Sequence, residues 1–193
     1  MLKDKRILFG ICGSFCNHAK VLDEIKSLCE CNDVQFVVSE NVFATDTRFF
    51  KAEEFLNQLQ QLSTHPILHT IQEAEQIGPR KYFDLMVIAP MTASVASKIA
   101  NGDYDHPVTL AAKAMLRNKK NIVFGIATND GLGSSAKNIF SLLNYRNFYA
   151  IPFRQDAPFE KERSIVADWS LIEETCQKAL ENEQIQPILL GGN

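Results

Sequence analysis

The sequence has 193 residues, of which 46% are hydrophobic and 22% are charged, so it is long and apolar enough to bury a substantial core. This composition excludes the disordered, collagen-like and low-complexity classes. The net charge is −3, and no run of lysine and arginine is long enough to follow a phosphate backbone, so we expect no nucleic-acid partner.

Strands and helices are expected to alternate along the chain. The expected strands are apolar runs rich in β-forming residues, at 6–12, 34–39, 85–89, 121–127 and 148–152. The expected helices carry apolar residues at helical spacing, at 15–31, 52–62, 93–100, 108–116, 135–143 and 170–183. Pro90 is expected to end the third strand, and residues 153–163 to form an irregular polar stretch.

The apolar strands are continuous rather than alternating, which indicates a sheet buried on both faces. We therefore predict one α/β domain over residues 1–193, with a doubly wound parallel sheet and its ligand at the carboxyl ends of the strands. The apolar stretch before Ser14 is too short for a signal peptide or a membrane span. This predicts a cytoplasmic protein without membrane contact.

The cysteines and histidines do not follow a metal-binding pattern. None of the five cysteines belongs to a paired zinc-ligand spacing, and we interpret them as reduced thiols. His65 and His69 are four residues apart, but Pro66 between them argues against a shared helical face. No metal site is expected.

The turn after the first expected strand, at Gly13 and Ser14, has the residues of a phosphate site. Glycine lets the backbone approach an anion, and the start of the next helix favours negative charge there. The dinucleotide fingerprint Gly-x-Gly-x-x-Gly is absent, so a mononucleotide fits better than NAD. An ordinary tight turn is an equally good interpretation of the same residues.

The loop after the second expected strand offers further phosphate donors. It contains the hydroxyls of Ser39, Thr45 and Thr47 and the guanidinium of Arg48. The alternative is a capped loop in which Asp46 or Thr47 begins the next helix.

The segment from Pro90 to Asn101 follows a buried strand, at the edge where ligands collect. Thr92 is a candidate N-cap, and Ser94, Lys98 and Asn101 share one polar stripe of the expected helix with Ser97. We favour a functional role over a merely solvated helix face, because the other side of this helix has small residues that suit close packing.

Polar residues also follow the later strands. Asn129 and Asp130 come directly after the fourth expected strand and are candidates for a site or for a simple turn. Arg154 lies in a proline-containing loop that is either a lid over an acidic substrate or a surface connection. We predict that Arg154, with Lys98 as a second cation, recognises the carboxylates of a small dicarboxylate substrate.

The motifs, in this order, resemble the flavoprotein superfamily that contains phosphopantothenoylcysteine decarboxylase, the lantibiotic cysteine decarboxylases and the flavin prenyltransferases. The resemblance covers nearly the whole chain. Its main motifs are Gly-Ser at 13–14, Thr-Asp-Thr-Arg-Phe at 45–49, Val-Ile-Ala-Pro-Met-Thr at 87–92, Ser-Lys-Ile-Ala-Asn at 97–101, Thr-Asn-Asp-Gly-Leu-Gly at 128–133 and Ile-Pro-Phe-Arg-Gln-Asp-Ala-Pro-Phe at 151–159.

The resemblance implies a flavodoxin-like (Rossmann-like) fold, a homo-oligomer and bound FMN. It implies that Gly13, Ser14 and Ser39 contact the flavin phosphate, with Thr45 nearby. It further implies that the segment containing Pro90, Met91, Thr92 and Ser94 contacts the rest of the flavin or the substrate. Asn129 corresponds to the asparagine of the decarboxylases' Pro-Ala-Met-Asn motif. Lys98, Asn129 and Arg154 are the candidate catalytic residues.

Departures from the superfamily pattern argue against decarboxylation. Gln76 stands eight residues before Asp84, where the decarboxylases carry a histidine, and glutamine does not shuttle protons near neutral pH. Residues 153–169 also lack the decarboxylases' reactive cysteine, and Pro-Met-Thr-Ala-Ser-Val at 90–95 departs from their Pro-x-x-Ala-Asn-Thr motif.

Within the superfamily, the chain most resembles the proteins that serve dipicolinate formation during sporulation. This resemblance implies an oxidoreductase component that works with a separate A subunit. Because this chain lacks a dinucleotide fingerprint, the NADP site is expected on that partner. Two alternatives remain open: an FMN-dependent decarboxylase that uses a different acid, and a non-catalytic flavin-binding regulatory protein.

Overall fold

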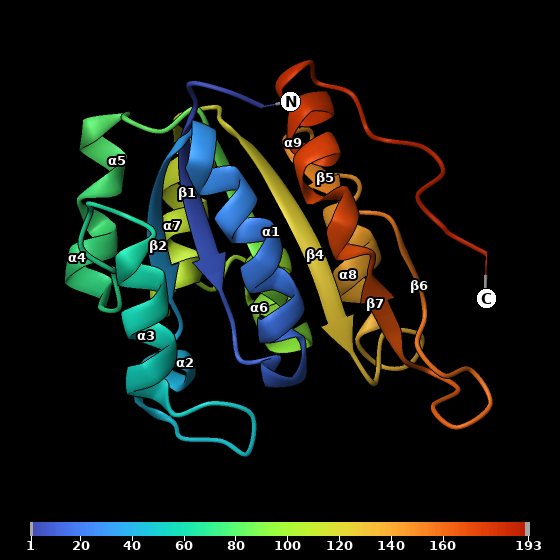
Figure 1. Cartoon of the computed structure of the whole chain (residues 1–193). Helices are drawn as coiled ribbons and strands as arrows, with labels where there is room; N and C mark the ends of the chain where they lie inside the picture. Colours follow the sequence, from blue (N-terminus) through green and yellow to red (C-terminus); the bar gives the residue numbers. More distant parts are fainter. Residues whose placement is uncertain (1, 192–193) are drawn as a thin grey trace.

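A computed structural model describes residues 2–191, in which a central sheet is covered by helices on both faces (Figure 1). The strands are β1 (Arg6–Ile11), β2 (Asp33–Val38), β3 (Leu85–Met91), β4 (Asn121–Thr128), β5 (Phe148–Ala150), β6 (Phe153–Gln155) and β7 (Ile165–Ala167). The first five are parallel and lie in the order β2-β1-β3-β4-β5. This order confirms the predicted doubly wound, flavodoxin-like sheet.

The helices are α1 (His18–Cys31), α2 (Glu40–Ala44), α3 (Ala52–Gln61), α4 (Ile71–Glu75), α5 (Ile77–Arg80), α6 (Ala93–Ala100), α7 (Pro107–Arg117), α8 (Ala136–Leu142) and α9 (Ile172–Leu180). Helices α1 and α9 lie on one face of the sheet and α6, α7 and α8 on the other (Figure 1). The sequence does not predict α2, α4 or α5, because four or five residues are too few to establish a helical period.

The core is formed by β3 and β4 and the helices packed on them. Every residue of β3 is buried, and in β4 only Thr128 is partly exposed. The small side chains of Ala111 and Ala112 in α7 are fully buried, which lets that helix lie close to the sheet. The continuous apolar strands thus have the two-sided burial that the sequence predicts.

Pro90 does not end the third strand as expected. The Ala89–Pro90 peptide bond is cis, and β3 continues to Met91, which pairs with Ile126 of β4. The pairing register shifts between Ile88 and Met91, because proline has no N–H to donate to the ladder. The strand therefore brings Met91, and Thr92 directly after it, to the edge of the sheet formed by the carboxyl ends of the parallel strands.

Residues 153–163 are not wholly irregular. The short strands β6 and β7 pair antiparallel, with Arg154 opposite Val166, and β7 also pairs antiparallel with the end of β4 through Ala127. The sheet is therefore mixed at this edge rather than fully parallel. Strands of three residues leave too little pattern in the sequence, and their pairing is decided by contacts distant along the chain. The resulting β6–β7 hairpin stands beside the carboxyl end of β4.

Two further structural findings concern residues 2–191. None of their helices is both long and apolar enough to cross a membrane. Over the same residues, no group of three or more histidine, cysteine or acidic side chains is placed to bind a metal ion.

Candidate functional site

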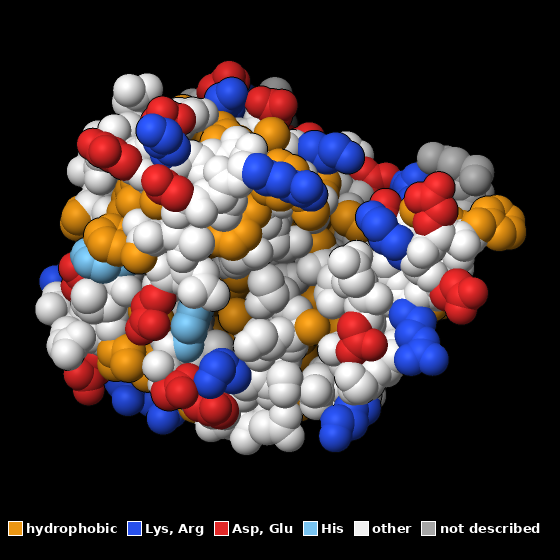
Figure 2. Space-filling view, turned by 90° about the horizontal axis from the view of Figure 1, so that it is seen from below, with side chains coloured by type: hydrophobic (Ala, Val, Ile, Leu, Met, Phe, Trp, Pro, Cys, Tyr) orange, Lys and Arg blue, Asp and Glu red, His pale blue; other side chains and the backbone are white. Residues whose placement is uncertain are grey.

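A cavity of about 770 Å³ opens at the carboxyl ends of the parallel strands. Figure 2 looks onto this edge of the sheet, and the face is hollowed near its centre. The walls come from the turn after β1, the loop after β2, the ends of β3 and β4, and the β6–β7 hairpin. The lining includes Gly13, Ser14, Cys16, Asn17, Lys20, Arg48, Phe49, Thr92, Ser94, Thr128, Asn129, Asp156, Lys161 and Val166. Its place is the one where doubly wound sheets bind ligands.

The turn at Gly13 and Ser14 is held in place by hydrogen bonds around Cys12. The Ser14 amide donates to the Cys12 carbonyl at 2.9 Å, and the Cys12 amide donates to the Pro90 carbonyl at 3.2 Å. The Nε2 atom of His18 lies 2.8 Å from the same Cys12 carbonyl. The turn is therefore fixed to β3 and to α1 before any ligand binds.

Asn17 links this turn to the C-terminal part of the chain. Its Nδ2 donates to Ser14 Oγ at 3.1 Å, and its Oδ1 accepts from Trp169 Nε1 at 3.3 Å. Because Trp169 lies two residues after the end of β7, the hairpin side of the cavity and the turn side are tied together.

Positive charge predominates among the ionic side chains of the cavity. Lys20, Arg48 and Lys161 line it, and Asp156 is the acidic residue in the lining. Lys161 pairs with Asp156 at 3.0 Å, whereas Arg48 lies 4.8 Å from the centre of the Phe49 ring. Lys20 forms no hydrogen bond or ion pair with the residues described. Lys20 and Arg48 are thus available to an anion.

The ends of β3 and β4 supply uncharged polar groups. Thr92 caps α6, its hydroxyl accepting from the Val95 amide at 3.3 Å, and this places Ser94 in the first turn at the cavity. After β4, Asn129 lines the cavity beside the loop that Asp130 organises. These groups can hydrogen-bond a neutral, polar part of a ligand.

Asp130 fixes the loop after β4. Its carboxylate accepts from the hydroxyls of Ser134 and Ser135 at 2.7 and 2.9 Å, and these bonds lower its pKa. A Cβ atom at Gly133 would lie 2.1 Å from Asp130 Oδ1, so a larger residue there would displace the carboxylate from its present position. Asp130 is therefore a structural residue that positions Asn129.

The Flavoprotein family model matches residues 1–148. The chain belongs to the flavoprotein family. It is 43% identical over 190 residues to the B subunit of dipicolinate synthase from Bacillus subtilis (strain 168), covering 98% of this chain and 95% of that protein. The resemblance predicted from the motifs is confirmed.

Solved structures of flavoprotein-family relatives have the same fold. The crystal structure of the dipicolinate synthase B subunit from Bacillus halodurans C matches with a TM-score of 0.89 at 42% identity, covering 98% of this chain and 97% of that one. The FMN-dependent cysteine decarboxylase SpaF matches with a TM-score of 0.69 at 17% identity, covering 94% of this chain and 99% of that one. At that identity the likeness to SpaF concerns the fold alone.

The cavity of this flavoprotein brings together five of the residues expected to bind a cofactor: Gly13, Ser14, Thr92, Ser94 and Asn129. Four others do not line it. Ser39 is buried and its hydroxyl accepts from the Val42 amide at 3.3 Å as the cap of α2, while Thr45 ends that helix beside a separate, very small hollow. Pro90 and Met91 are buried within β3.

The two expected substrate cations lie outside the cavity. The Nζ atom of Lys98 pairs with Asp105 at 2.7 Å and Asp103 at 3.1 Å, and these bonds raise its pKa. Arg154 pairs with Asp168 in an adjoining hollow. Both cations are therefore balanced by local carboxylates.

Sequence reasoning missed Asn17, Lys20 and Lys161. A signal was present for Asn17 and Lys20. Lys20 comes four residues after Cys16 and three after Asn17, a spacing that places all three on one helix face beside the turn. Lys161 could not have been found, because only the β6–β7 pairing brings its loop to the cavity.

Gln76 lies outside this cavity, and its correspondence to the decarboxylases' histidine stays a prediction. The helices α4 and α5 occupy the interval before Asp84, and Gln76 lines a different cavity. His69 lies just beyond Leu68, which pairs alongside Val37 of β2. Its ring stacks on Phe43 with 3.7 Å between ring centres.

The thiol nearest the turn is buried and unreactive. Burial raises the pKa of the Cys12 thiol to about 12, so it stays protonated at neutral pH. Cys16 is exposed in the cavity lining, and all five cysteines, which lie within the described residues, are free of disulfides. The reduced state of the five thiols stays a prediction.

The buried His18 ring is expected to make the stability of the protein depend on pH. Its ring is 1% exposed and stacks on Phe55, and burial lowers its pKa below the usual 6.5. Below about pH 6.5 the unfolded chain therefore binds a proton at this histidine that the folded chain does not bind. The contribution of the neutral His18 ring to the unfolding free energy is fully present above about pH 6.5 and is lost as the pH falls below it. We expect the unfolding free energy to fall by up to about 1.4 kcal/mol per pH unit there.

Urea unfolding at pH 5, 6, 7 and 8 measures this effect. The variant His18→Gln keeps a side-chain donor but does not titrate, and its stability should change less over that range. Part of the pH dependence of stability remains in this variant, because burial also lowers the pKa of His106. Equal slopes in the variant and the parent protein would contradict the assignment to His18.

Proposed function

We propose that this chain acts as the B subunit of a dipicolinate synthase. In this role it is a component of the oxidoreductase complex that forms pyridine-2,6-dicarboxylate during sporulation. The observation that carries the proposal is 43% identity to the Bacillus subtilis dipicolinate synthase chain over 98% of this one. The cavity at the carboxyl ends of the strands supports a role in binding a small molecule.

FMN is the cofactor we propose for this cavity, and the residues present fit it. The turn at Gly13 and Ser14, with Lys20 and Arg48, would hold the phosphate, because main-chain amides and cations both bind phosphate oxygens. Thr92, Ser94 and Asn129 would bind the uncharged remainder. Bound flavin supplies a two-electron acceptor.

The reaction proposed requires loss of water and a two-electron oxidation that completes the aromatic ring. The polar, cation-lined cavity suits a substrate with carboxylates, and Lys161 is the candidate to bind them. Lys161 replaces Lys98 and Arg154 in that role, because it lines the cavity and those two cations do not.

A partner protein completes the proposed enzyme. The name of the Bacillus subtilis relative supports assembly with an A subunit, on which we place the NADP site because this chain has no dinucleotide fingerprint. We further propose that residues 1–193 act as one flavoprotein-like domain and that the chain forms a homo-oligomer. A dodecameric FMN-dependent decarboxylase shares the fold.

Reconstitution tests the proposed function. The purified chain, its A subunit and the two together are supplied with the dihydrodipicolinate-pathway intermediate, and dipicolinate is followed by absorbance. We expect product only from the mixture. Equal rates from the A subunit alone would contradict a required role for this chain. Release of CO2 by this chain alone from a peptide with a C-terminal cysteine would favour a decarboxylase.

A matched pair of variants connects the activity to the cavity. Ser94→Trp places a large side chain in the lining, and it should reduce dipicolinate formation at least tenfold. Ser27→Trp makes the same change at an exposed position of α1 outside the lining, and it should retain activity. Equal activity of the two variants would show that the cavity does not take part.

A further inference from the structure

A second cavity, of about 360 Å³, lies beside β2 and shares no lining residue with the candidate flavin site. It is enclosed by Gln35 of β2, the segment after α3, the helices α4 and α5, and the residues just before β3. Its floor is apolar, because Leu68, Ile77 and Phe83 line it and are at least nine-tenths buried. No part of the proposed function uses this cavity.

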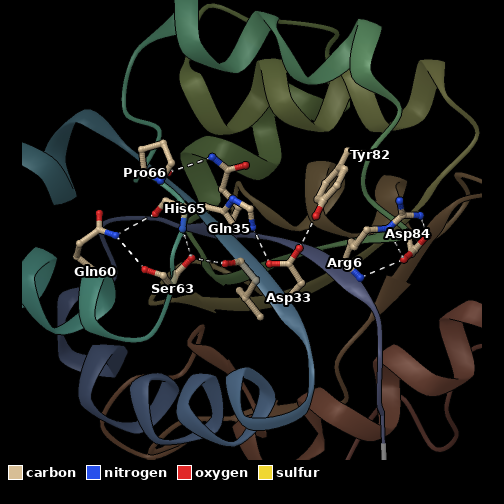
Figure 3. A network of polar contacts seen from close by, with 10 residues as sticks. Arg6, Asp33, Gln35, Gln60, Ser63, His65, Pro66, Tyr82 and Asp84 are labelled. Atoms are coloured by element: carbon tan, nitrogen blue, oxygen red, sulfur yellow. Dashed lines mark hydrogen bonds and ion pairs between the residues drawn. The ribbon is translucent and has the colours of Figure 1, made fainter.

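The wall of the second cavity is fastened by the carboxylate of Asp33, as Figure 3 shows. Its Oδ1 lies 2.6 Å from His65 Nε2, and its Oδ2 accepts from the Tyr82 hydroxyl. Beside it, Gln35 Nε2 donates to the Pro66 carbonyl at 3.0 Å. Segments far apart along the chain are thereby held at fixed positions around one hollow.

Tyr82 is fixed from its other side as well. The Arg6 guanidinium lies 5.0 Å from the centre of the Tyr82 ring and pairs with Asp84 at 2.8 Å (Figure 3). The Tyr82 and Phe83 rings meet edge to face, with 5.2 Å between their centres. The aromatic part of the lining is therefore ordered before a ligand binds.

The helix α5, which forms part of the rim of the second cavity, is anchored on α7. Asn118, at the end of α7, donates to the Gly78 carbonyl at 3.0 Å. A Cβ atom at Gly78 would lie 3.0 Å from the Arg117 guanidinium, so the two helices approach closely at this glycine. The position of Arg80, two residues further on, is set by this contact.

Arg80 places a positive charge at the rim of the apolar hollow. Its Nη2 donates to the neutral amide oxygen of Gln76 at 3.0 Å, and within residues 2–191 it forms no ion pair. The carboxylate in the lining, Glu73, already accepts from the amides of His69 and Thr70 at 2.8 and 3.0 Å. The guanidinium therefore retains donors for an outside anion.

We propose that this cavity binds a small aromatic carboxylate, with its ring on the Leu68, Ile77 and Phe83 floor and its carboxylate on Arg80. The volume suits a single-ring ligand, and an apolar cavity with a few fixed polar groups is the usual form of a small-molecule site. Aromatic rings favour edge contacts with Tyr82 and Phe83, and a guanidinium matches the two oxygens of a carboxylate. The proposal goes beyond the flavin site and is independent of it.

Titration with benzoate and benzamide tests this site, because the two probes share a ring and differ in charge. Calorimetry should give at least tenfold tighter binding of benzoate. With methyl-labelled protein, benzoate should shift the NMR signals of Ile77 and Leu68. Absence of benzoate binding at millimolar concentration, equal binding of the two probes, or unshifted Ile77 and Leu68 signals would each overturn the proposal.

A matched pair of exposed variants assigns the charge. Arg80→Gln should weaken benzoate binding at least tenfold and leave benzamide binding unchanged. Lys81→Gln removes the same charge one residue away, outside the lining, and should retain benzoate binding within about twofold. Equal effects of the two variants would overturn the role of Arg80. Failure of FMN binding in a separate titration would count against the proposed function alone.

Discussion

Reversing the charges of Lys20 and Arg48 together, in Lys20→Glu with Arg48→Glu, is expected to lower the affinity for FMN about a hundredfold. That factor corresponds to about 2.7 kcal/mol, which is reasonable when two attractive charges near a phosphate become repulsive ones. Both side chains line the cavity beside the Gly13 and Ser14 turn, and neither pairs with a carboxylate among the residues described. Fluorescence quenching of FMN on titration with protein measures the affinity.

Riboflavin is the internal control for this prediction, because it has the same ring system without the phosphate. The parent protein should bind FMN more tightly than riboflavin, and the double variant should bind riboflavin within about threefold of the parent. The pair Lys3→Glu with Lys26→Glu makes the same change in net charge outside the lining and should leave FMN binding nearly unchanged. Equal affinities of the parent for FMN and riboflavin would remove the phosphate site.

Replacing Phe124 with alanine is expected to lower the unfolding free energy by about 3 to 5 kcal/mol. Phe124 is fully buried in the middle of β4, where it pairs with Ile88 on one side and Ala150 on the other. Its ring lies 6.0 Å from that of Phe148 in an edge-to-face contact. Removal of the ring loses apolar burial and leaves a cavity that the rigid sheet cannot close.

Phe159→Ala is the matched control, since the same ring is removed at a position that is 99% exposed in the β6–β7 hairpin. The unfolding free energy of this variant should stay within about 0.5 kcal/mol of the parent. Urea denaturation followed by circular dichroism measures both variants. A loss below about 1 kcal/mol for Phe124→Ala would show that β4 is not the centre of the core.

Local pattern was enough to predict the alternating elements of the chain. The helix expected at 93–100 is α6 with the same bounds, because Thr92 caps it and Gly102 follows its end. The apolar runs of β1 and β4 were found to within one residue, because two-sided burial leaves an unbroken apolar signal. The parallel sheet and the edge at which the cavity opens followed from that alternation.

The sequence by itself thus determined the longer strands and helices, the superfamily resemblance and the five expected residues that meet in the cavity. Only the tertiary structure decided which charges face it. Arg154 and Lys98 resemble free cations along the chain, but Asp168, Asp103 and Asp105 lie beside them in space. Ion pairing and the β6–β7 pairing depend on residues distant along the chain, and local pattern carries no information about such contacts.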